Sequence, residues 1–278
     1  MKQYRILIDS PDEKGLVYKI SKIFFEHDLN IISNNEFVDK ENDKFFMRSV
    51  VAGTINPLRL EEKIAHILSK NASVHVIEPK KKNIALLATK ESHALGDILI
   101  RYEAGELDAN IVAVISNYDL LEPLVSKFDI PYVTVSHVDL DRESHEREVI
   151  KALDSFGDLD YIVLAKYMRI LTPNFVECYA DKIINIHHSF LPAFIGANPY
   201  KQAFERGVKI IGATAHFVNN NLDEGPIIAQ EIIPIDHAYS WRDMQRSGRD
   251  VEKIVLSRAL KLALEDRIFV HANKTVIF

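Results

Sequence analysis

Hydrophobic positions in the first eighty residues follow helical spacing in two stretches and a strand-like pattern in four others. Leu16, Ile20, Ile23 and Phe24, for example, share one face of a helix. The predicted elements are a strand over 4–8, a helix over 16–25, strands over 30–38 and 44–51, a helix over 57–68 and a strand over 73–77. This βαββαβ order predicts a ferredoxin-like fold.

From residue 84 onward, short continuous apolar runs alternate with helical stretches, which predicts an α/β fold with a mostly parallel, Rossmann-like sheet buried on both faces. The predicted strands are 84–89, 111–116, 132–135, 161–165, 183–186, 210–218 and 227–233. The predicted helices are 94–104, 120–128, 146–156 and 241–266, and 274–278 is a final strand or tail. The proline and lysines of 78–83 indicate a solvated linker, so the predicted domains are 1–80 and 84–278.

Composition narrows the class of protein. A net charge of −6 argues against nucleic acid as a partner, because phosphate binding needs a basic surface. The single cysteine, Cys178, excludes an intrachain disulfide and suggests a reducing compartment. It lies in the helix-like stretch 174–179, where we expect it to be buried. The N-terminus does not have the pattern of a signal peptide, and no apolar run approaches membrane-spanning length, so we expect a cytoplasmic protein that binds no membrane.

Two separated segments contain the residues best suited to chemistry. Asn185 and His187 alternate on the short apolar strand 183–186 and its end, so their side chains point to one face. Asp223 follows in the turn-forming segment 222–226. An amide N–H suits a developing oxyanion, an imidazole moves a proton, and a carboxylate orients the histidine or a water. If the fold brings them together, the trio fits acyl or formyl chemistry.

The sequence leaves several assignments around this trio open. His187 has three suitable roles: deprotonating the attacking nucleophile, protonating the leaving group, or stabilising the oxyanion. His188 points to the other face if the strand continues, and we expect it to support the site rather than act as a second catalyst or a metal ligand. His216 is a candidate to hold the Asp223 carboxylate, with Thr214 beside it on the same face. We expect neither a metal nor a cofactor.

Three ordered blocks resemble the formyltransferase superfamily that uses 10-formyltetrahydrofolate. The blocks are Asn185-x-His187-x-Ser189-x-Leu191-Pro192, Gly212-Ala213-Thr214-Ala215-His216-Phe217-Val218 and Leu222-Asp223-x-Gly225-Pro226-Ile227-Ile228. The segment 166–173 also resembles the superfamily loop that lines the pterin pocket. This resemblance implies apolar walls formed by Met168, Ile170 and Leu171, and an ion pair between Arg169 and the glutamate tail of the folate.

The first domain resembles the ACT domain. The resemblance rests on the βαββαβ order, on Pro11-Asp12-x-x-Gly15-Leu16 after the first strand, and on Asn30-Ile31 at the start of the second. It implies a small effector, often an amino acid, near Asp12, Gly15 and Asn30. Because such pockets usually form between paired ACT units, we expect a homo-oligomer. A plain dimerisation role without an effector is the alternative.

Nearly the whole chain resembles the deformylase branch of the superfamily. The specific parts include Thr89-Lys90-Glu91-x-His93-x-Leu95-Gly96-Asp97, Ala165-Lys166-Tyr167-Met168-Arg169, His187-His188-Ser189-Phe190-Leu191-Pro192 and Arg249-Asp250-Val251-Glu252. The loop at 89–97 lacks the closely spaced glycines that bind an acceptor's phosphate in the purine-pathway transferases. The resemblance implies hydrolysis of 10-formyltetrahydrofolate to tetrahydrofolate and formate, which balances one-carbon pools and supplies purine synthesis. Two alternatives remain: a formyltransferase with a small acceptor, and a non-catalytic amino-acid or folate sensor.

Overall fold

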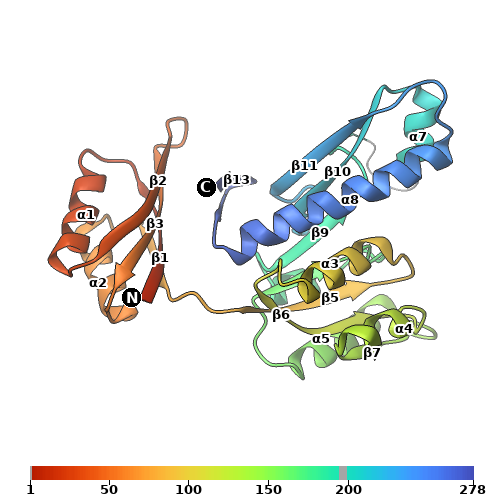
Figure 1. Cartoon of the computed structure of the whole chain (residues 1–278), viewed down its shortest axis with the longest axis horizontal. Coiled ribbons are helices and arrows are strands. Elements are labelled where there is room, and N and C mark those ends of the chain that lie inside the picture. Colours follow the sequence, from red (N-terminus) through yellow and green to blue (C-terminus); the bar gives the residue numbers. More distant parts are fainter. Residues whose placement is uncertain (1, 194–198) are drawn as a thin grey trace. The chain divides into compact units, whose positions relative to one another are not determined.

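The computed structural model describes residues 2–193 and 199–278 (Figure 1). The chain divides into two compact units. The first contains the residues up to Lys80 together with 266–269 and 276–278, and the second contains 81–265 together with 270–275. No helix in the described ranges is long and apolar enough to cross a membrane.

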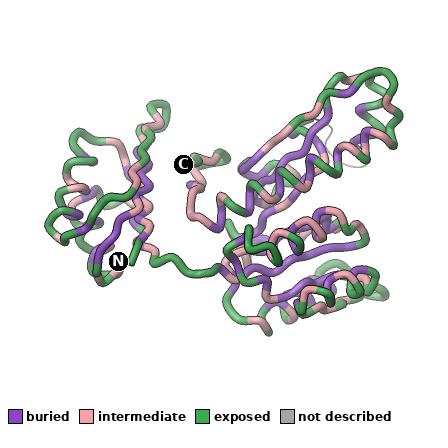
Figure 2. The backbone as a smooth tube through the Cα atoms, viewed as in Figure 1, coloured by how far each residue is buried: buried purple, intermediate pink, exposed green. Residues whose placement is uncertain are grey.

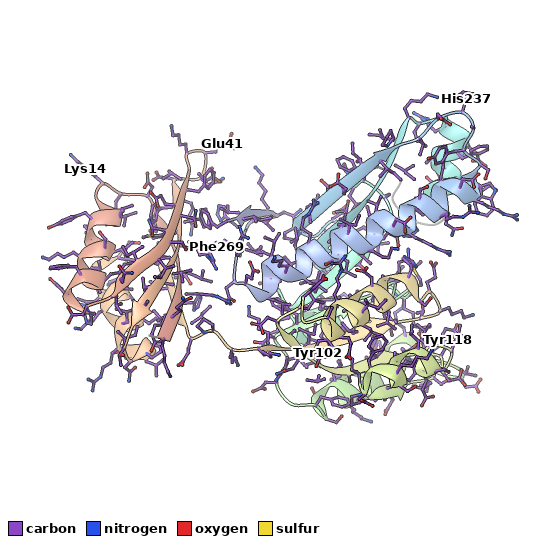
Figure 3. The ribbon with its side chains drawn as sticks, in the orientation of Figure 1. Lys14, Glu41, Tyr102, Tyr118, His237 and Phe269 are labelled. Atoms are coloured by element: carbon purple, nitrogen blue, oxygen red, sulfur yellow. The ribbon has the colours of Figure 1, made fainter. Side chains whose placement is uncertain are left out.

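The first unit is a four-stranded antiparallel sheet with two helices. Its elements are β1 (Lys2–Pro11), α1 (Leu16–Glu26), β2 (Asn30–Asp39), β3 (Lys44–Gly53), α2 (Pro57–Ile67) and β4 (Ser73–Ile77). The strands lie in the order β2-β3-β1-β4, and Glu41 lies at the tip of the β2–β3 hairpin (Figure 3). The predicted βαββαβ order is therefore confirmed.

The residue before each helix of this unit favours a helix start, and each helix packs through one apolar face. Gly15 precedes α1 with φ of 89°, a left-handed conformation that glycine adopts without strain. Asn56 caps α2 by accepting a hydrogen bond from the Arg59 backbone N–H at 3.2 Å. The core joins the inner faces of α1 and α2 to alternate residues of β1, which include Tyr4, Ile6 and Ile8.

The second unit is a seven-stranded sheet flanked by helices on both faces. Its elements up to the fifth strand are β5 (Lys82–Ala88), α3 (His93–Glu103), β6 (Ala109–Ser116), α4 (Glu122–Val125), η1 (Ser126–Phe128), β7 (Tyr132–Thr134), α5 (Arg142–Asp154), β8 (Tyr161–Leu164), α6 (Pro173–Cys178) and β9 (Ile183–His187). The later elements are α7 (Pro199–Arg206), β10 (Ile210–Phe217), β11 (Ile227–Pro234) and α8 (Trp241–Leu264). The strand order is β11-β10-β9-β8-β5-β6-β7. Strands β5 to β9 pair in parallel and β10 and β11 pair antiparallel, which confirms the mostly parallel sheet.

The middle strands β5 and β6 are buried along most of their length (Figure 2). On one face, Ala85 and Leu87 of β5 pack with Val149 and Leu153 of α5 and with residues of α6. On the other face, α8 covers β9, β10 and β11 and lies beside α3 (Figure 1). Because both faces are covered, the side chains available to a ligand lie at the carboxyl ends of the parallel strands.

The C-terminal segment differs from the sequence-based expectation. A hairpin of β12 (Ile268–His271) and β13 (Lys274–Ile277) ends the chain, and part of it groups with the first unit rather than the second. The Asp266 carboxylate accepts a hydrogen bond from Arg5 of β1 at 2.8 Å, and the ring of Phe269 packs edge-on against Phe46 of β3. These contacts explain the grouping, because both link the segment to the first sheet.

Two further expectations need correction. Cys178 is exposed rather than buried, because it is the last residue of the short helix α6. The helix predicted over 120–128 is a four-residue α-helix followed by a 3-10 turn. Pro123 near its start and the left-handed Asp129 after its end limit its length.

Candidate functional site

The candidate site lies where β8, β9 and β10 meet at the carboxyl ends of the parallel strands. The antiparallel register of β9 with β10 places His216 opposite Asn185 and Thr214 opposite His187. The two residues from each strand are two positions apart, and side chains at that spacing point to the same face. All four side chains therefore point to one face of the sheet. The register of β10 with β11 shifts between Ala215 and His216, an irregularity that is common next to active sites.

His187 and Asp223 form a buried pair. The His187 Nδ1 atom lies 3.2 Å from Asp223 Oδ1, with about 6% and 9% of the two side chains exposed. His187 Nε2 is buried and has no hydrogen-bond partner within the described ranges. An imidazole that donates from Nδ1 to the carboxylate keeps Nε2 available to exchange a proton with a substrate in the cleft.

Asn185 is oriented by His216. The Asn185 Nδ2 atom donates to His216 Nε2 at 3.2 Å, and His216 Nδ1 donates to the Phe217 carbonyl oxygen at 2.7 Å. This tautomer makes Nε2 an acceptor, which fixes the amide orientation and leaves the second N–H of Asn185 for a ligand. His216 Nε2 lies 3.9 Å from Asp223 Oδ1, so its hydrogen bond goes to Asn185 rather than to the carboxylate that we expected it to hold.

The loop of Asp223 is held close to the end of β10. Asp223 itself has φ of 57°. A Cβ atom at Gly225 would lie only 1.7 Å from the Phe217 carbonyl oxygen, so this position accepts glycine alone. Burial acts to raise the pKa of Asp223, but the hydrogen bond from His187 and the nearby imidazoles outweigh it and hold the pKa below its ordinary value. The carboxylate is therefore ionised near neutral pH.

His188 does not point to the opposite face, because β9 ends at His187. The two rings lie 5.1 Å apart between centroids, and both line the same cleft. Burial lowers the pKa of His188 to about 3, and the Lys166 ammonium acts in the same direction. His188 is thus a neutral imidazole in the folded protein.

Thr214 supports the turn that follows β9. Its hydroxyl donates to the Ser189 carbonyl oxygen at 2.9 Å and accepts from the Leu191 backbone N–H at 3.0 Å and from Gln230 Nε2 at 2.9 Å. These bonds satisfy a fully buried side chain. Thr214 therefore holds the turn that directly follows the two histidines and does not face a ligand.

The site opens into a cleft of about 310 Å³, a volume typical of small-molecule sites. The segment 166–171 forms one wall and the segment 218–223, which includes three consecutive asparagines, forms another. Met168 is 59% and Ile170 50% exposed there, as expected of walls that a planar apolar ligand would cover. The guanidinium of Arg169 has no hydrogen bond or ion pair with a residue in the described ranges.

Sequence reasoning missed a buried polar cluster beside this cleft. In this cluster of four residues, Lys166, His93 and Tyr200 each lie within hydrogen-bonding or ion-pair distance of the Glu252 carboxylate. Three of them belong to motifs that carry the family resemblance, but their spacing along the chain gave no sign of contact. In residues 2–193 and 199–278, no group of three or more His, Cys, Asp or Glu side chains could hold a metal ion.

The three candidate effector residues lie in the first unit. Gly15 directly precedes α1, Asn30 is exposed at the start of β2, and the Asp12 backbone N–H donates to the Asp43 carbonyl oxygen at 2.9 Å. The N-terminus of α1 has no side-chain cap and no acidic residue in its first turn. Its backbone N–H groups therefore suit an anionic ligand.

Comparison with known proteins agrees with this architecture. Residues 82–260 match the Formyl transferase family and residues 4–67 match the ACT domain. The chain is 55% identical over 272 residues to a formyltetrahydrofolate deformylase from Haemophilus influenzae, covering 98% of each chain. It is 42% identical over 284 residues to the one from Bacillus subtilis, covering 99% of this chain and 93% of that protein.

Solved structures give the same picture. The crystal structure of a formyltetrahydrofolate deformylase from Pseudomonas syringae superposes with a TM-score of 0.95 and 41% identity, covering 100% of this chain and 95% of that one. A glycinamide ribonucleotide transformylase from Symbiobacterium toebii matches with a TM-score of 0.68 and 27% identity, over 71% of this chain and 94% of its own.

The neutral state of His188 predicts an acid-sensitive fold. Below its ordinary pKa of 6.5 the unfolded chain binds a proton at His188, whereas the folded protein does so only near 3. The free energy of unfolding therefore falls as the pH is lowered through this window. Between pH 6.5 and 5, we expect the wild type to lose about 1–2 kcal/mol more than His188→Gln.

Urea unfolding followed by the fluorescence of Trp241, the single tryptophan, measures this difference in the second unit. The other buried histidines are common to both proteins, so their effects cancel. Equal losses in the two proteins would show that His188 is not held neutral.

Proposed function

The chain belongs to the formyltetrahydrofolate deformylase family, and from its site we infer that it hydrolyses 10-formyltetrahydrofolate to tetrahydrofolate and formate. The observation that supports this activity most directly is the set of Asn185, His187 and Asp223 in one cleft. The formate released would supply purine synthesis, and the reaction would balance one-carbon pools. A cytoplasmic location and the absence of a required metal or cofactor stay predictions.

The chemistry starts with a water oxygen that attacks the formyl carbon while its proton leaves for a base. Asp223 is the proposed acceptor and orienting group for this water. Its ionised carboxylate offers Oδ2, which accepts no hydrogen bond from a described residue. The free N–H of Asn185 then donates to the oxyanion of the tetrahedral centre. Such a donor lowers a barrier by roughly 3–4 kcal/mol.

Collapse of the tetrahedral centre breaks the bond between the formyl carbon and N10. The leaving nitrogen must gain a proton as the carbon becomes formate. His187 is the proposed donor, because it lines the cleft and its Nε2 has no partner among the described residues, while Nδ1 is held by Asp223. The proton that Asp223 took from the water is held on Oδ2, so Oδ1 still accepts from His187 Nδ1 and keeps the ring in place while Nε2 gives its proton to N10. The proton on Asp223 then leaves to solvent, and His187 regains one for the next turnover.

The folate would lie along the wall formed by 166–171. Met168, Ile170 and Leu171 supply apolar contacts for the pterin, and Arg169 supplies a cation for the glutamate tail. This proposal is supported by the exposure of Met168 and Ile170 and by the Arg169 guanidinium, which makes no hydrogen bond or ion pair with a described residue.

We further propose that the first unit binds an amino acid and pairs with a second copy. The uncapped N-terminus of α1 suits the ligand carboxylate, and Asp12 and Asn30 suit its amine. Edge strand β2 exposes Ile32 and Phe37, and α1 exposes Tyr18 and Phe25, which is much apolar surface for a monomer. This surface supports a homo-oligomer.

Formate release without any added acceptor tests the activity. We expect Asn185→Ala, His187→Ala and Asp223→Asn each to lower kcat by roughly 100-fold or more, because each removes a donor, an acid or a base from the reacting centre. His237→Ala is the control, since this exposed histidine lies in the β11–α8 connection (Figure 3) and does not line the cleft. Wild-type turnover in folded His187→Ala would reject its assignment, and acceptor-dependent release would favour the transferase alternative.

Arg169→Ala should mainly raise KM. A contact with the glutamate tail is equal in the ground and transition states, so its loss weakens binding without slowing the chemical step. Arg242→Ala, which changes an exposed arginine that does not line the cleft, should leave KM unchanged. A fall in kcat at constant KM would instead place Arg169 in the chemistry.

An amino acid that binds the first unit should change the rate by the factor of about 5–150 that is typical of allosteric coupling. Calorimetric titration of the common amino acids against the intact chain identifies it. Gly15→Val should abolish the response while basal hydrolysis is kept, because the side chain strains a left-handed turn at the pocket.

Gly105→Val is the matched control, since Gly105 is also left-handed with nothing within 4 Å of its Cβ position. Light scattering of the same samples measures the oligomeric state. If no amino acid binds or changes the rate, the first unit has only a structural role.

A further inference from the structure

Lys166 combines three unusual properties at the edge of the cleft. Its backbone has φ of 63°, in the left-handed region that a side chain with a Cβ atom rarely adopts. Its side chain is only 4% exposed although it ends in an ammonium group. It also lines the cleft that holds Asn185, His187 and Asp223. A strained residue that persists beside a reacting centre points to a functional reason for keeping it.

The ammonium of Lys166 joins a buried carboxylate. Lys166 Nζ lies 3.4 Å from Glu252 Oε2, which also accepts from His93 Nε2 at 2.7 Å. Tyr200 donates its hydroxyl to Glu252 Oε1 at 2.7 Å. The cluster of Lys166, Glu252, His93 and Tyr200, here called the Glu252 cluster, thus draws on α3, α7, α8 and the segment after β8.

Several features keep the Glu252 cluster rigid. Burial acts to raise the pKa of Glu252, but His93, Lys166 and Tyr200 outweigh it and lower the pKa to about 2, so the carboxylate stays ionised. Thr89 Oγ1 donates to the Lys166 carbonyl oxygen at 2.8 Å and fixes the backbone. A Cβ atom at Gly248 would lie 2.1 Å from the Tyr200 hydroxyl, so a glycine in α8 is what lets the tyrosine reach Glu252.

The Glu252 cluster fills space directly beside the reacting groups. His188 lines the catalytic cleft, and its ring lies 5.9 Å from the ring of Tyr200. Lys166 lines the same cleft, and its ammonium is held at the Glu252 carboxylate. The Lys166 side chain therefore takes up space in the wall of the site itself, and Tyr200 lies next to His188 in the same region.

A formyl group held at Asn185 and His187 is open to any nucleophile that reaches its carbon. Water is the smallest, and a primary amine is a stronger nucleophile but needs space for its substituent. A buried ion pair is weak support for stability, because desolvation offsets most of its attraction. Stability therefore does not explain why four elements converge on this ionic group.

We propose that Lys166, held by the Glu252 cluster, is the specificity determinant that excludes amine nucleophiles from the formyl carbon and leaves access to water alone. This inference rests on the proposed hydrolysis. It assigns Lys166 no part in proton transfer: the side chain acts through its volume and its fixed position.

Lys166→Gly is the decisive change. Glycine adopts φ of 63° without strain, so the substitution removes the side chain while the backbone keeps its conformation. Glu252 keeps its bonds to His93 and Tyr200 and is not left unpaired. Lys166→Met is the matched control, because it keeps the volume of the side chain and removes its charge.

The experiment supplies 10-formyltetrahydrofolate with and without glycinamide as the probe amine. In the diverted reaction the amine nitrogen attacks the formyl carbon, the bond from carbon to N10 breaks, the amine loses a proton and N10 gains one. The products are tetrahydrofolate and N-formylglycinamide. Mass spectrometry measures N-formylglycinamide and formate in the same samples, which gives the partition between amine and water.

We expect the wild type and Lys166→Met to release formate only, and Lys166→Gly to raise the share of N-formylglycinamide at least 10-fold. The inference is overturned if Lys166→Gly is folded and still gives no more amide than the wild type. Amide formation by the wild type, or equal amide formation by Lys166→Met, would also overturn it. The expectation that the wild type forms no N-formylglycinamide is tested even if Lys166→Gly fails to fold. If the wild type released no formate, the proposed hydrolysis itself would fail, which is a separate outcome.

Discussion

The pairing of β9 with β10 is the constraint on which the site depends. Both strands lie inside the sheet, between β8 and β11. Their register places His216 opposite Asn185 and Thr214 opposite His187. A shift of β10 by one residue would turn His216 and Thr214 to the opposite face, away from Asn185 and His187. The amide orientation, the turn after β9 and the contact between His187 and Asp223 all follow from this one register.

The site contains more buried polar groups than its chemistry uses. His216 and Glu252 are buried and His188 is half-buried; His216 orients Asn185, and Glu252 holds Tyr200. Burial lowers the pKa of both histidines, whereas hydrogen bonds and cations lower that of Glu252 against its burial. Neutral imidazoles and a charged carboxylate therefore coexist near neutral pH, and no proton needs to move among the supporting groups.

Local sequence patterns predicted most of the fold, because hydrophobic spacing and turn residues report directly on helices and buried strands. They also brought Asn185, His187 and Asp223 together through motif order. They missed β12 and α7, whose short apolar patterns are weak, and they misassigned Cys178. The partner of His216 and the contact of Lys166 with Glu252 depend on strand register and on packing between residues 86 positions apart, which no local pattern contains.

The grouping of Asp266 and Phe269 with the first sheet makes the N-terminal unit a discontinuous domain, assembled from both ends of the chain. Such a unit cannot be removed at a single cut. Cleavage at the linker would leave Asp266 without Arg5 and would expose an aromatic surface at the end of the remaining protein. The two units are therefore expected to evolve together, because the first could be exchanged for another module only if the last thirteen residues changed with it.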